Sequence, residues 1–366
     1  MNKTADYFEP EWMFAIKDGF DIVIGNPPYI QLQTDGGKLA DLYEDEKFET
    51  FKRTGDIYCL FYERGWQLLK ENGHLCFITS NKWMRADYGK LLREFLANKT
   101  NPELLIDLGP KVFDSATVDT NILLFARSND NVGKTDSCIA KEGCRNDLSG
   151  FFRQHATECA FTTSDSWVIL NPIEQLIKQK IEAIGTPLKD WDIRINYGIK
   201  TGCNEAFIIN ETQKAELIAE DPKSAEIIRP ILRGRDIKRY GYDFAGLYLI
   251  ATHNGIPEKG IPRIKIDDYP AIKRHLNKYK REINARYDKG DTPYNLRSCA
   301  YWEDFSKPNI VWGNLCLSAQ FSYTEERFFI NAPSPMIVPG NKYILAVLNS
   351  KLGDWYIRHL GVIRIT

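Results

Sequence analysis

The sequence predicts an α/β protein, with an open sheet and helices in its first part and a second domain of α+β type. An apolar run over residues 20–25 is typical of a strand that is buried in a parallel sheet. Segments of helical and strand-like periodicity alternate from there to about residue 127. The chain has 366 residues, a length for which two domains are the natural expectation.

The elements of the first part follow one another in a regular order. Asp56 and Asp87 are residues of the type that cap a helix, and Asn72-Gly73 is a typical helix end. After the first strand the sequence predicts a helix over 56–70, a strand over 74–79, a helix over 87–98, and strands over 104–108 and 118–126.

The first predicted strand is followed directly by the tetrapeptide Asn26-Pro27-Pro28-Tyr29. Ligands of open α/β sheets bind just beyond the carboxyl ends of the strands. Both prolines have a fixed φ and no N–H, so this loop presents oxygen acceptors in a stiff frame. The side-chain oxygen of Asn26 and the carbonyl of Pro27 can each accept one hydrogen of a planar amino group, and Tyr29 offers a face for stacking. We predict a catalytic site for methyl transfer to nitrogen, the alternative being a proline turn that merely ends a strand.

Residues 10–127 resemble the second half of a class I, S-adenosylmethionine-dependent DNA methyltransferase of the adenine-N6 gamma group, which includes the TaqI-like and type IIG restriction-modification enzymes. Besides the tetrapeptide, residues 56–69, 73–79 and 91–96 match the middle motifs of that family, and residues 111–114 match its last catalytic motif. The resemblance implies the C-terminal half of a Rossmann-like fold. It also implies that Phe113 lies against the opposite side of the base from Tyr29. By its residue type alone, Phe113 suits a core position equally well.

Enzymes of this group bind S-adenosylmethionine through a Gly-rich turn and an acidic residue that precede the Asn-Pro-Pro-Tyr motif. Only 25 residues precede Asn26, and no Gly-x-Gly turn follows a strand there. We therefore expect a fragment that exposes a sheet edge, binds the cofactor weakly and is inactive alone, its partners being the N-terminal half of the parent and, in the type IIG arrangement, a nuclease. A circular permutation is the alternative, but no matching Gly-rich turn lies downstream.

The second half of the chain has its own resemblance. Residues 128–165 are polar with little periodicity, which predicts a linker or insert between a domain over 1–127 and a domain over 166–366. Five segments of the second domain resemble the TaqI-like target-recognition domain: 197–207, 228–237, 296–299, 307–310 and 345–351. The resemblance implies double-stranded DNA as the partner and a domain that continues beyond residue 366.

Charge is unevenly distributed along the chain. Residues 223–286 hold 15 Lys and Arg against 7 Asp and Glu, a balance of +8, although the whole chain has a net charge of -1. A basic stretch of this kind indicates a polyanion surface, the alternative being a solvated helix face. The residues that we predict to contact DNA are Arg233, Arg235, Lys238, Arg239, Lys273, Arg274, Lys278 and Lys280.

Composition excludes several classes. With 43% hydrophobic residues the chain is globular, and no apolar stretch approaches the ~20 residues that span a membrane. No signal peptide is recognisable, so we expect a cytoplasmic protein with reduced cysteines. The cluster Cys138, Cys144, His155 and Cys159 matches no common zinc spacing, and no metal site is predicted.

Taken together, these features predict part of a site-specific DNA adenine-N6 methyltransferase of a restriction-modification system, which flips its target base out of the duplex. Protein-glutamine methyltransferases share the tetrapeptide, but they lack an appended basic domain. Cytosine-N4 methyltransferases share the geometry, with Ser or Asp more often at the first position. A DNA-recognition module without catalysis is the third alternative.

Overall fold

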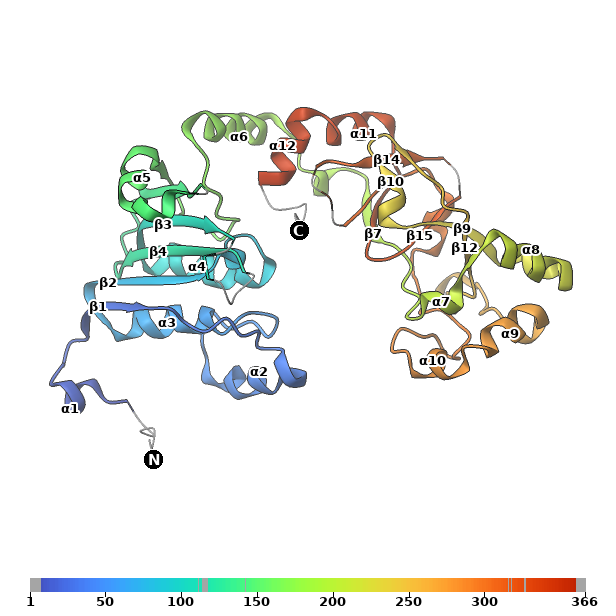
Figure 1. The fold of residues 1–366 in the computed structure, drawn as a ribbon, viewed down its shortest axis with the longest axis horizontal. Helices are drawn as coiled ribbons and strands as arrows, with labels where there is room; N and C mark the ends of the chain where they lie inside the picture. Colours follow the sequence, from blue (N-terminus) through green and yellow to red (C-terminus); the bar gives the residue numbers. More distant parts are fainter. Residues whose placement is uncertain are drawn as a thin grey trace. The chain divides into compact units, whose positions relative to one another are not determined.

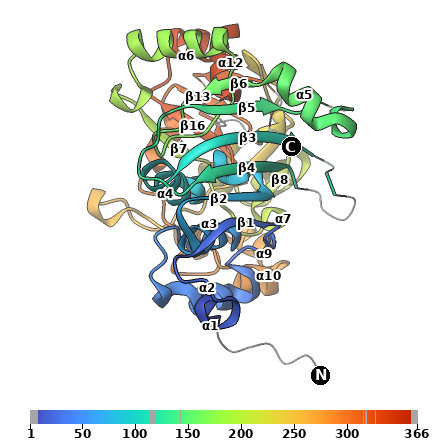
Figure 2. The same ribbon diagram turned by 90° about the vertical axis from the view of Figure 1, so that its left-hand side faces the viewer.

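The computed structural model describes residues 8–110, 112–113, 118–141, 143–314, 316, 318–325 and 327–359. The chain divides into two compact units, residues 1–184 and 185–366, which Figures 1 and 2 show from two sides. This division lies later in the chain than the boundary expected near residue 165, because residues 128–184 pack with the first unit.

The first unit is built on a six-stranded sheet in the order β1-β2-β4-β3-β5-β6, visible in Figure 2 as a stack of neighbouring strands. β1 is parallel to β2, and β3 is parallel to β5, whereas β4 is antiparallel to both β2 and β3. The strands are β1 (Phe20–Gly25), β2 (Leu69–Ser80), β3 (Asn101–Gly109), β4 (Thr120–Ala126), β5 (Thr135–Ile139) and β6 (Thr157–Cys159). The helices are α1 (Pro10–Phe14), α2 (Lys38–Tyr43), α3 (Tyr58–Leu68), α4 (Lys90–Lys99), α5 (Leu148–His155) and α6 (Pro172–Ile184).

Helices cover both faces of this sheet. Leu105 and Leu123 point into a core shared with α3 and α4, whereas their neighbours Ile106 and Ile122 pack on the opposite face with α5. This is the alternation that a strand with two buried faces requires. Gly65 lets α3 approach β2 closely, because a Cβ at this position would lie 2.4 Å from Cδ1 of Leu75. All five elements predicted between residues 56 and 126 are present, but the helix end predicted at Asn72-Gly73 is wrong, because these residues lie within β2.

The segment predicted as a linker contributes structure to the sheet. β5 and β6 extend the sheet beyond β3, and α5 packs against β5. β6 has only 3 residues and β5 only 5, too few to show a clear periodicity in the sequence. Buried Cys138 and Cys159 lie on these two strands as free thiols.

β1 forms one edge of the sheet, as expected for a fragment, but the prediction that its apolar run is buried is wrong, because no residue of this strand is buried. Among the described residues it pairs only with β2, and its other side carries no strand. Ile22 is 67% exposed and Ile24 is 78% exposed. Two such side chains on a strand are unusual at a solvent-facing edge, where charged residues are preferred.

The second unit contains two four-stranded sheets, in the orders β15-β9-β12-β8 and β14-β13-β16-β7, and a short hairpin of β10 and β11. One large core includes Ile231, Leu249 and Phe305, and a smaller one lies under α11 and α12. The strands are β7 (Arg194–Tyr197), β8 (Ile208–Asn210), β9 (Ile228–Leu232), β10 (Ile237–Lys238), β11 (Gly241–Tyr242), β12 (Leu247–Ile250), β13 (Asn309–Trp312), β14 (Phe321–Thr324), β15 (Phe329–Ile330) and β16 (Pro335–Val338). The helices are α7 (Asn204–Phe207), α8 (Glu211–Glu220), α9 (Pro270–Asn277), α10 (Lys280–Ala285), α11 (Lys342–Leu348) and α12 (Lys351–His359).

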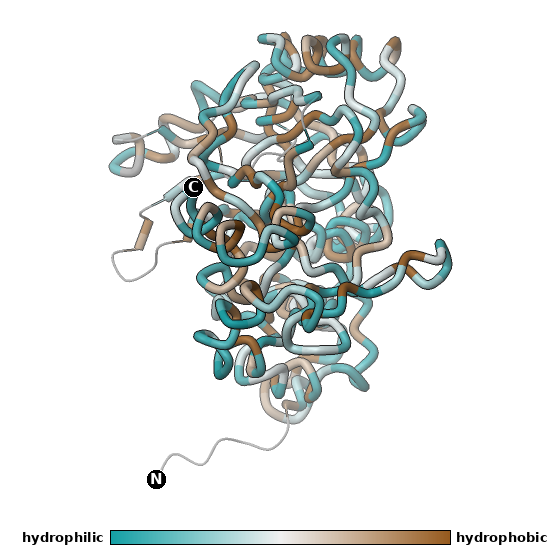
Figure 3. Tube along the Cα trace, turned by 90° about the vertical axis from the view of Figure 1, so that its right-hand side faces the viewer, coloured by the Kyte–Doolittle hydropathy of each residue, from teal (hydrophilic) through white to brown (hydrophobic). Residues whose placement is uncertain are grey.

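Hydrophobic and hydrophilic residues are interspersed along the chain, as Figure 3 shows for the side that it displays. In the part of the chain that the structure describes, no helix is both long and apolar enough to cross a membrane.

Candidate functional site

The tetrapeptide Asn26-Pro27-Pro28-Tyr29 lies where β1 ends. Because β1 is parallel to β2, with Gly25 beside Phe77, the loop is next to the carboxyl end of β2. The end of β3 and the start of β4 lie beside the carboxyl end of β2, since Thr120 pairs with both Ser80 and Gly109. The tetrapeptide and the segment between β3 and β4, which contains Phe113, therefore follow strand ends on the same side of the sheet.

The loop is held at both ends. On one side it continues from β1, and on the other side the N–H of Ile57 donates to the carbonyl of Ile30 at 2.9 Å. The N–H of Leu32 donates to the carbonyl of Gly55, also at 2.9 Å. Pro27 is buried, while Asn26 is exposed. These contacts, with the fixed φ of the prolines, limit the movement of the Asn26 side chain relative to the sheet.

Tyr29 makes a direct contact with Asn26. Its hydroxyl donates to Oδ1 of Asn26 at 3.0 Å and lies 3.4 Å from the carbonyl oxygen of Ile78. Its ring meets Tyr58 edge-on, with ring centroids 6.3 Å apart. Burial raises the pKa of Tyr29, so the hydroxyl keeps its proton and acts as a donor. Because an amide oxygen has two lone pairs, Oδ1 of Asn26 can accept a second hydrogen from a bound amino group.

The carbonyl of Pro27 is the second acceptor that the sequence predicted. Among the described residues no donor bonds to it. Its hydrogen-bonding capacity is therefore not used by the described part of the protein, although Pro27 itself is buried.

A buried polar chain supports the strand ends beneath this loop. The hydroxyl of Tyr62 lies 3.0 Å from Oγ1 of Thr79, which donates to Oδ1 of Asn121 at 3.0 Å. Nε1 of Trp83 donates to the same oxygen at 3.2 Å. These residues were not among the predicted site residues. The sequence pattern that could have revealed them is the single Asn121 within an otherwise apolar strand. Asn121 is fully buried, and a buried Asn side chain requires hydrogen-bond partners.

Phe113 is half-buried in the connection between β3 and β4. Its described neighbour Val112 packs against the apolar cluster of Ile106 and Leu108. The other two residues of the predicted motif, Lys111 and Asp114, lie outside the described residues. No ring contact joins Phe113 to Tyr29 in the described part of the chain, so their placement on two sides of one base stays a prediction.

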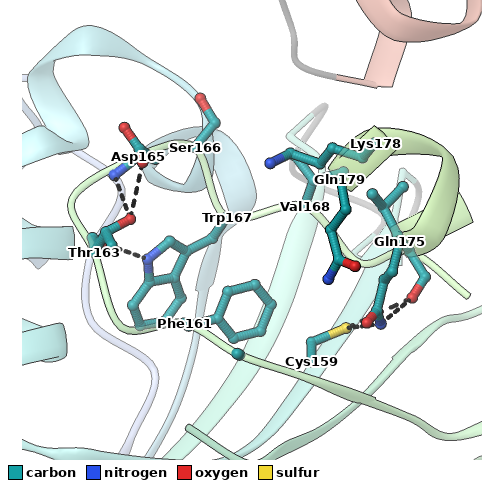
Figure 4. Close-up of a pocket in the computed structure, with 12 residues that line it drawn as sticks. Cys159, Phe161, Thr163, Asp165, Ser166, Trp167, Val168, Gln175, Lys178 and Gln179 are labelled. Atoms are coloured by element: carbon teal, nitrogen blue, oxygen red, sulfur yellow. Dashed lines mark hydrogen bonds between the residues drawn. The ribbon is translucent and has the colours of Figure 1, made fainter. Parts of the chain in front are cut away.

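The first unit also has a hollow that is separate from this loop. It encloses about 200 Å³ and lies between α6 and residues 159–170, as Figure 4 shows. Phe161 and Trp167 stack in its wall with ring centroids 4.6 Å apart, and Trp167 donates to the carbonyl of Thr163. The hollow is below the ~300–1,000 Å³ that is usual for ligand pockets. We assign it no role in the site.

The first group of predicted DNA contacts lies around β10. Arg233 is occupied within the protein, because Nε and one terminal nitrogen donate to the buried carboxylate of Asp236 at 2.9 and 2.8 Å. Burial would raise the pKa of Asp236, but the hydrogen bonds from Arg233 lower it below its ordinary value. Lys238 donates to the carbonyl of Arg235 at 2.8 Å. Among the described residues the exposed guanidinium of Arg235 forms no ion pair.

The second group lies on α9 and α10. Lys273 pairs with Asp267 at 2.5 Å, and Arg274 pairs with Glu220. Lys278 and Lys280 are exposed, and in the described part of the chain neither forms an ion pair. These two lysines are therefore the members of the group that are available to a polyanion.

The two basic groups are close in the sequence but lie in different parts of the second unit. β10 packs on β13 and β14, whereas α9 contacts α7, α8 and α10. Figure 1 shows β10 and the pair α9–α10 at different ends of the second unit. The charge balance of residues 223–286 is thus divided between two places in the fold.

Comparison with known families follows the same two-part division. Residues 1–113 match the Eco57I restriction-modification methylase family, and residues 229–363 match the TaqI-like C-terminal specificity domain. The resemblance identified from the motifs is thereby confirmed in both parts of the chain.

The curated relatives that the chain matches include type II restriction and methyltransferase enzymes. It is 26% identical to the type II restriction enzyme and methyltransferase RM.Eco57I of Escherichia coli over 386 residues, which covers 93% of this chain and 38% of that protein. It is 23% identical to the type II methyltransferase M.BstVI of Geobacillus stearothermophilus, with 94% of this chain and 63% of that protein covered. The chain therefore spans between about a third and two thirds of the length of these relatives.

Among solved structures, the type IIL restriction-modification enzyme MmeI in complex with DNA is similar in fold. The TM-score is 0.59 at 13% sequence identity, and the match covers 90% of this chain and 42% of MmeI. The predicted fold class is confirmed by this similarity.

Proposed function

We propose that this chain forms the amino-group-binding loop and the target-recognition domain of a DNA adenine-N6 methyltransferase of a type II restriction-modification system. The observation that carries the proposal is the loop at the end of β1, where the side-chain oxygen of Asn26 is exposed beside Tyr29. The relatives RM.Eco57I and M.BstVI support the class of enzyme. The match of residues 229–363 to a specificity domain supports DNA as the substrate.

The chemistry follows from the two acceptors. An adenine amino group is planar because its nitrogen lone pair is conjugated with the ring, which makes it a poor nucleophile. Two N–H···O bonds, to Oδ1 of Asn26 and to the carbonyl of Pro27, favour a more tetrahedral nitrogen and stabilise the positive charge that develops on it. S-adenosylmethionine supplies an electrophilic methyl group on sulfur when it is bound. The amino nitrogen would take up this methyl group as the carbon–sulfur bond breaks with its electrons going to sulfur, and the nitrogen would release one of its two protons to water.

Access to the amino group requires the base to leave the duplex, since the reacting nitrogen is otherwise paired and stacked. The face of Tyr29 is proposed to stack on the flipped base, with Phe113 on the other side. The loop around Tyr29 suits this role because Tyr29 is half-buried and its hydroxyl is anchored at Asn26. A stacked base would bring its amino group toward the same oxygen.

The methyl donor is proposed to bind to a segment that pairs with the free edge of β1. Two observations support this: β1 has no second neighbour among the described residues, and Ile22 and Ile24 are exposed on it. Exposed residues of α1, including Trp12 and Phe14, lie just before the same strand and add to the apolar area. In the described chain no Gly-rich turn follows the carboxyl end of a strand near Asn26. The contacts to the methyl donor are therefore assigned to that additional segment.

The test is transfer of a labelled methyl group from S-adenosylmethionine to duplex DNA, followed by digestion to nucleosides and mass spectrometry. This chain alone is expected to transfer no label and to bind the donor weakly in calorimetry. The same chain joined to the segment that carries the donor site is expected to yield N6-methyladenine. If the product were N4-methylcytosine, the target base would be cytosine and not adenine. Label on glutamine of a protein, or none on DNA from the joined protein, would overturn it.

A further inference from the structure

The hairpin of β10 and β11 has an unusual residue at its tip. Lys238 pairs with Gly241, so Arg239 and Tyr240 form a two-residue turn. Tyr240 has φ +67°. This left-handed conformation is favourable for Gly, Asn or Asp and strained for a residue with an aromatic side chain. A tyrosine is therefore kept at a position where its backbone is disfavoured.

Packing does not explain why tyrosine occupies this position. Tyr240 as a residue is 54% exposed, and the guanidinium of Arg239 lies over its ring at 5.2 Å from the centroid. A buried ring would compensate for the strain by removing apolar surface from water, but this ring remains largely in solvent. Strained residues that are not compensated by packing occur preferentially at binding sites.

The tip is held rigidly by a segment far away in the sequence. Arg239 donates to the carbonyl of Asn349 at 2.6 Å, and the N–H of Tyr240 donates to the carbonyl of Phe321 at 2.9 Å. The side chain of Asn349 accepts from the N–H of Phe321 at 3.0 Å and donates to its carbonyl at 2.8 Å. Asn349 is fully buried. Residues 239–240, 321 and 349 thus form one clamp that fixes the hairpin tip.

Two further cations lie beside the tip. Arg235 and Lys238 are exposed and belong to the turn and strand that lead into it. An exposed aromatic ring on a fixed backbone, with cations on the neighbouring residues, is suited to a nucleic acid, which offers both apolar base faces and phosphates.

We propose that the Arg239–Tyr240 tip is a DNA-contacting element, in which Tyr240 places its ring against a base or sugar while the neighbouring cations bind phosphates. The inference rests on the proposed function only in taking DNA as the partner. It explains the strained backbone of Tyr240 by DNA binding. Asparagine or glycine would suit the turn better, but only tyrosine supplies the ring that contacts DNA.

The test compares folding stability and DNA affinity in the same variant. Tyr240→Asn relieves the backbone strain and removes the ring. We expect its thermal midpoint to be equal to or above that of the unmodified chain, and its affinity for a mixed-sequence duplex to fall roughly five- to a hundredfold, the range for loss of one aromatic stacking contact. Tyr240→Phe keeps the ring and is expected to keep the affinity. Tyr287→Ala removes another exposed tyrosine of the same unit and is expected to change neither quantity.

A second measurement needs no variant. A duplex that contains 5-iodouracil is cross-linked to the unmodified chain by light, and the cross-linked peptide is identified by mass spectrometry. Cross-links to Tyr240 support the proposal. Unchanged affinity of Tyr240→Asn overturns it, and so does a lower thermal midpoint without cross-links at the tip. If the unmodified chain binds no duplex at all, the inference about the tip fails, whereas methylation of DNA by the joined protein would still support the proposed function.

Discussion

The loop at the end of β1 and the tip of the β10–β11 hairpin are both short turns that present a tyrosine, but they are built differently. Asn26 and Tyr29 are three residues apart, and their hydrogen bond lies within one loop. At the hairpin, Arg239 and Tyr240 depend on Phe321 and Asn349, which come from distant parts of the chain. A site for one small group can be encoded in a few consecutive residues, whereas a surface for a polymer requires segments that only the fold brings together.

The basic residues also show that the fold decides which side chains are available to a ligand. Arg233 and Arg235 are separated by one residue, yet Arg233 is bound to buried Asp236 while Arg235 is exposed. Charge counted along the sequence does not distinguish a cation that stabilises the fold from one that is available to a ligand. The predictions below test this difference between a locally encoded site and an assembled one.

The largest effect is expected for Asn26→Ala in a form of the protein that is able to methylate DNA. Loss of an acceptor that bonds most strongly as charge develops should cost about 3–4 kcal/mol in the transition state, or ~10²–10³ in kcat, with little change in DNA affinity. Gln33→Ala, which removes a nearby exposed amide, is the matched control and should stay near full activity. Turnover of Asn26→Ala within about threefold of the unmodified enzyme would end the proposed role of this side chain.

Asn349→Ala tests the clamp that holds the tip of the β10–β11 hairpin. The substitution leaves the buried N–H and carbonyl of Phe321 without their side-chain partner, which should lower the free energy of unfolding by about 2–3 kcal/mol, whereas the bond from Arg239 goes to the backbone carbonyl of residue 349 and is kept. Urea denaturation measures this change. Asn341→Ala removes a helix cap at the start of α11 and should cost only about 1 kcal/mol. Equal effects of the two substitutions would show that the clamp is no stronger than an ordinary cap.

Tyr29 separates the contribution of a ring from that of a hydroxyl. Tyr29→Ala should weaken capture of the flipped base by about 1–3 kcal/mol, whereas Tyr29→Phe keeps the ring and loses only the hydroxyl, whose contacts with Asn26 and the carbonyl of Ile78 are worth about 0.5–1.5 kcal/mol. Fluorescence of 2-aminopurine at the target position reports base flipping directly. If Phe and Ala behave alike in this assay, the ring does not stack on the base.

The smallest effects are expected for the two neighbouring arginines, and they differ in kind. Arg233→Ala leaves the carboxylate of Asp236 buried without its partner and should lower stability by about 1–2 kcal/mol. Arg235→Ala should leave stability unchanged and reduce the slope of log affinity against log salt by about 0.9. Titrations between 50 and 200 mM salt distinguish the two, and a change of slope for Arg233→Ala alone would reverse their assignment.

The pH dependence of stability follows from the same ion pair. The pKa of Asp236 is lower in the folded protein than its ordinary value, so its contribution is fully present above the unfolded pKa and is lost as the pH falls through the folded value. Arg233→Ala should therefore flatten the decline in stability below about pH 4. This loss of acid sensitivity gives the Arg233 prediction a second readout.

The sequence by itself determined the alternation of strands and helices in the first part and the position of the Asn26 loop. Residue periodicity and the fixed φ of proline act over a few residues, so these features are visible without a fold. The same holds for the resemblance of both halves to known families, which depends on consecutive motifs. The sequence did not show that residues 128–165 extend the sheet, because strands as short as β5 and β6 are defined by their neighbours.

Only the tertiary structure decided which side chains are available. The chain Tyr62–Thr79–Asn121, the pairing of Arg233 with Asp236 and the clamp around Asn349 all join residues through burial or across strands. The exposure of Tyr240 on a strained backbone is likewise a property of three-dimensional packing. Residue type fixes the charge and hydrogen-bonding capacity of a side chain, but burial and partners fix whether that capacity is already used within the protein.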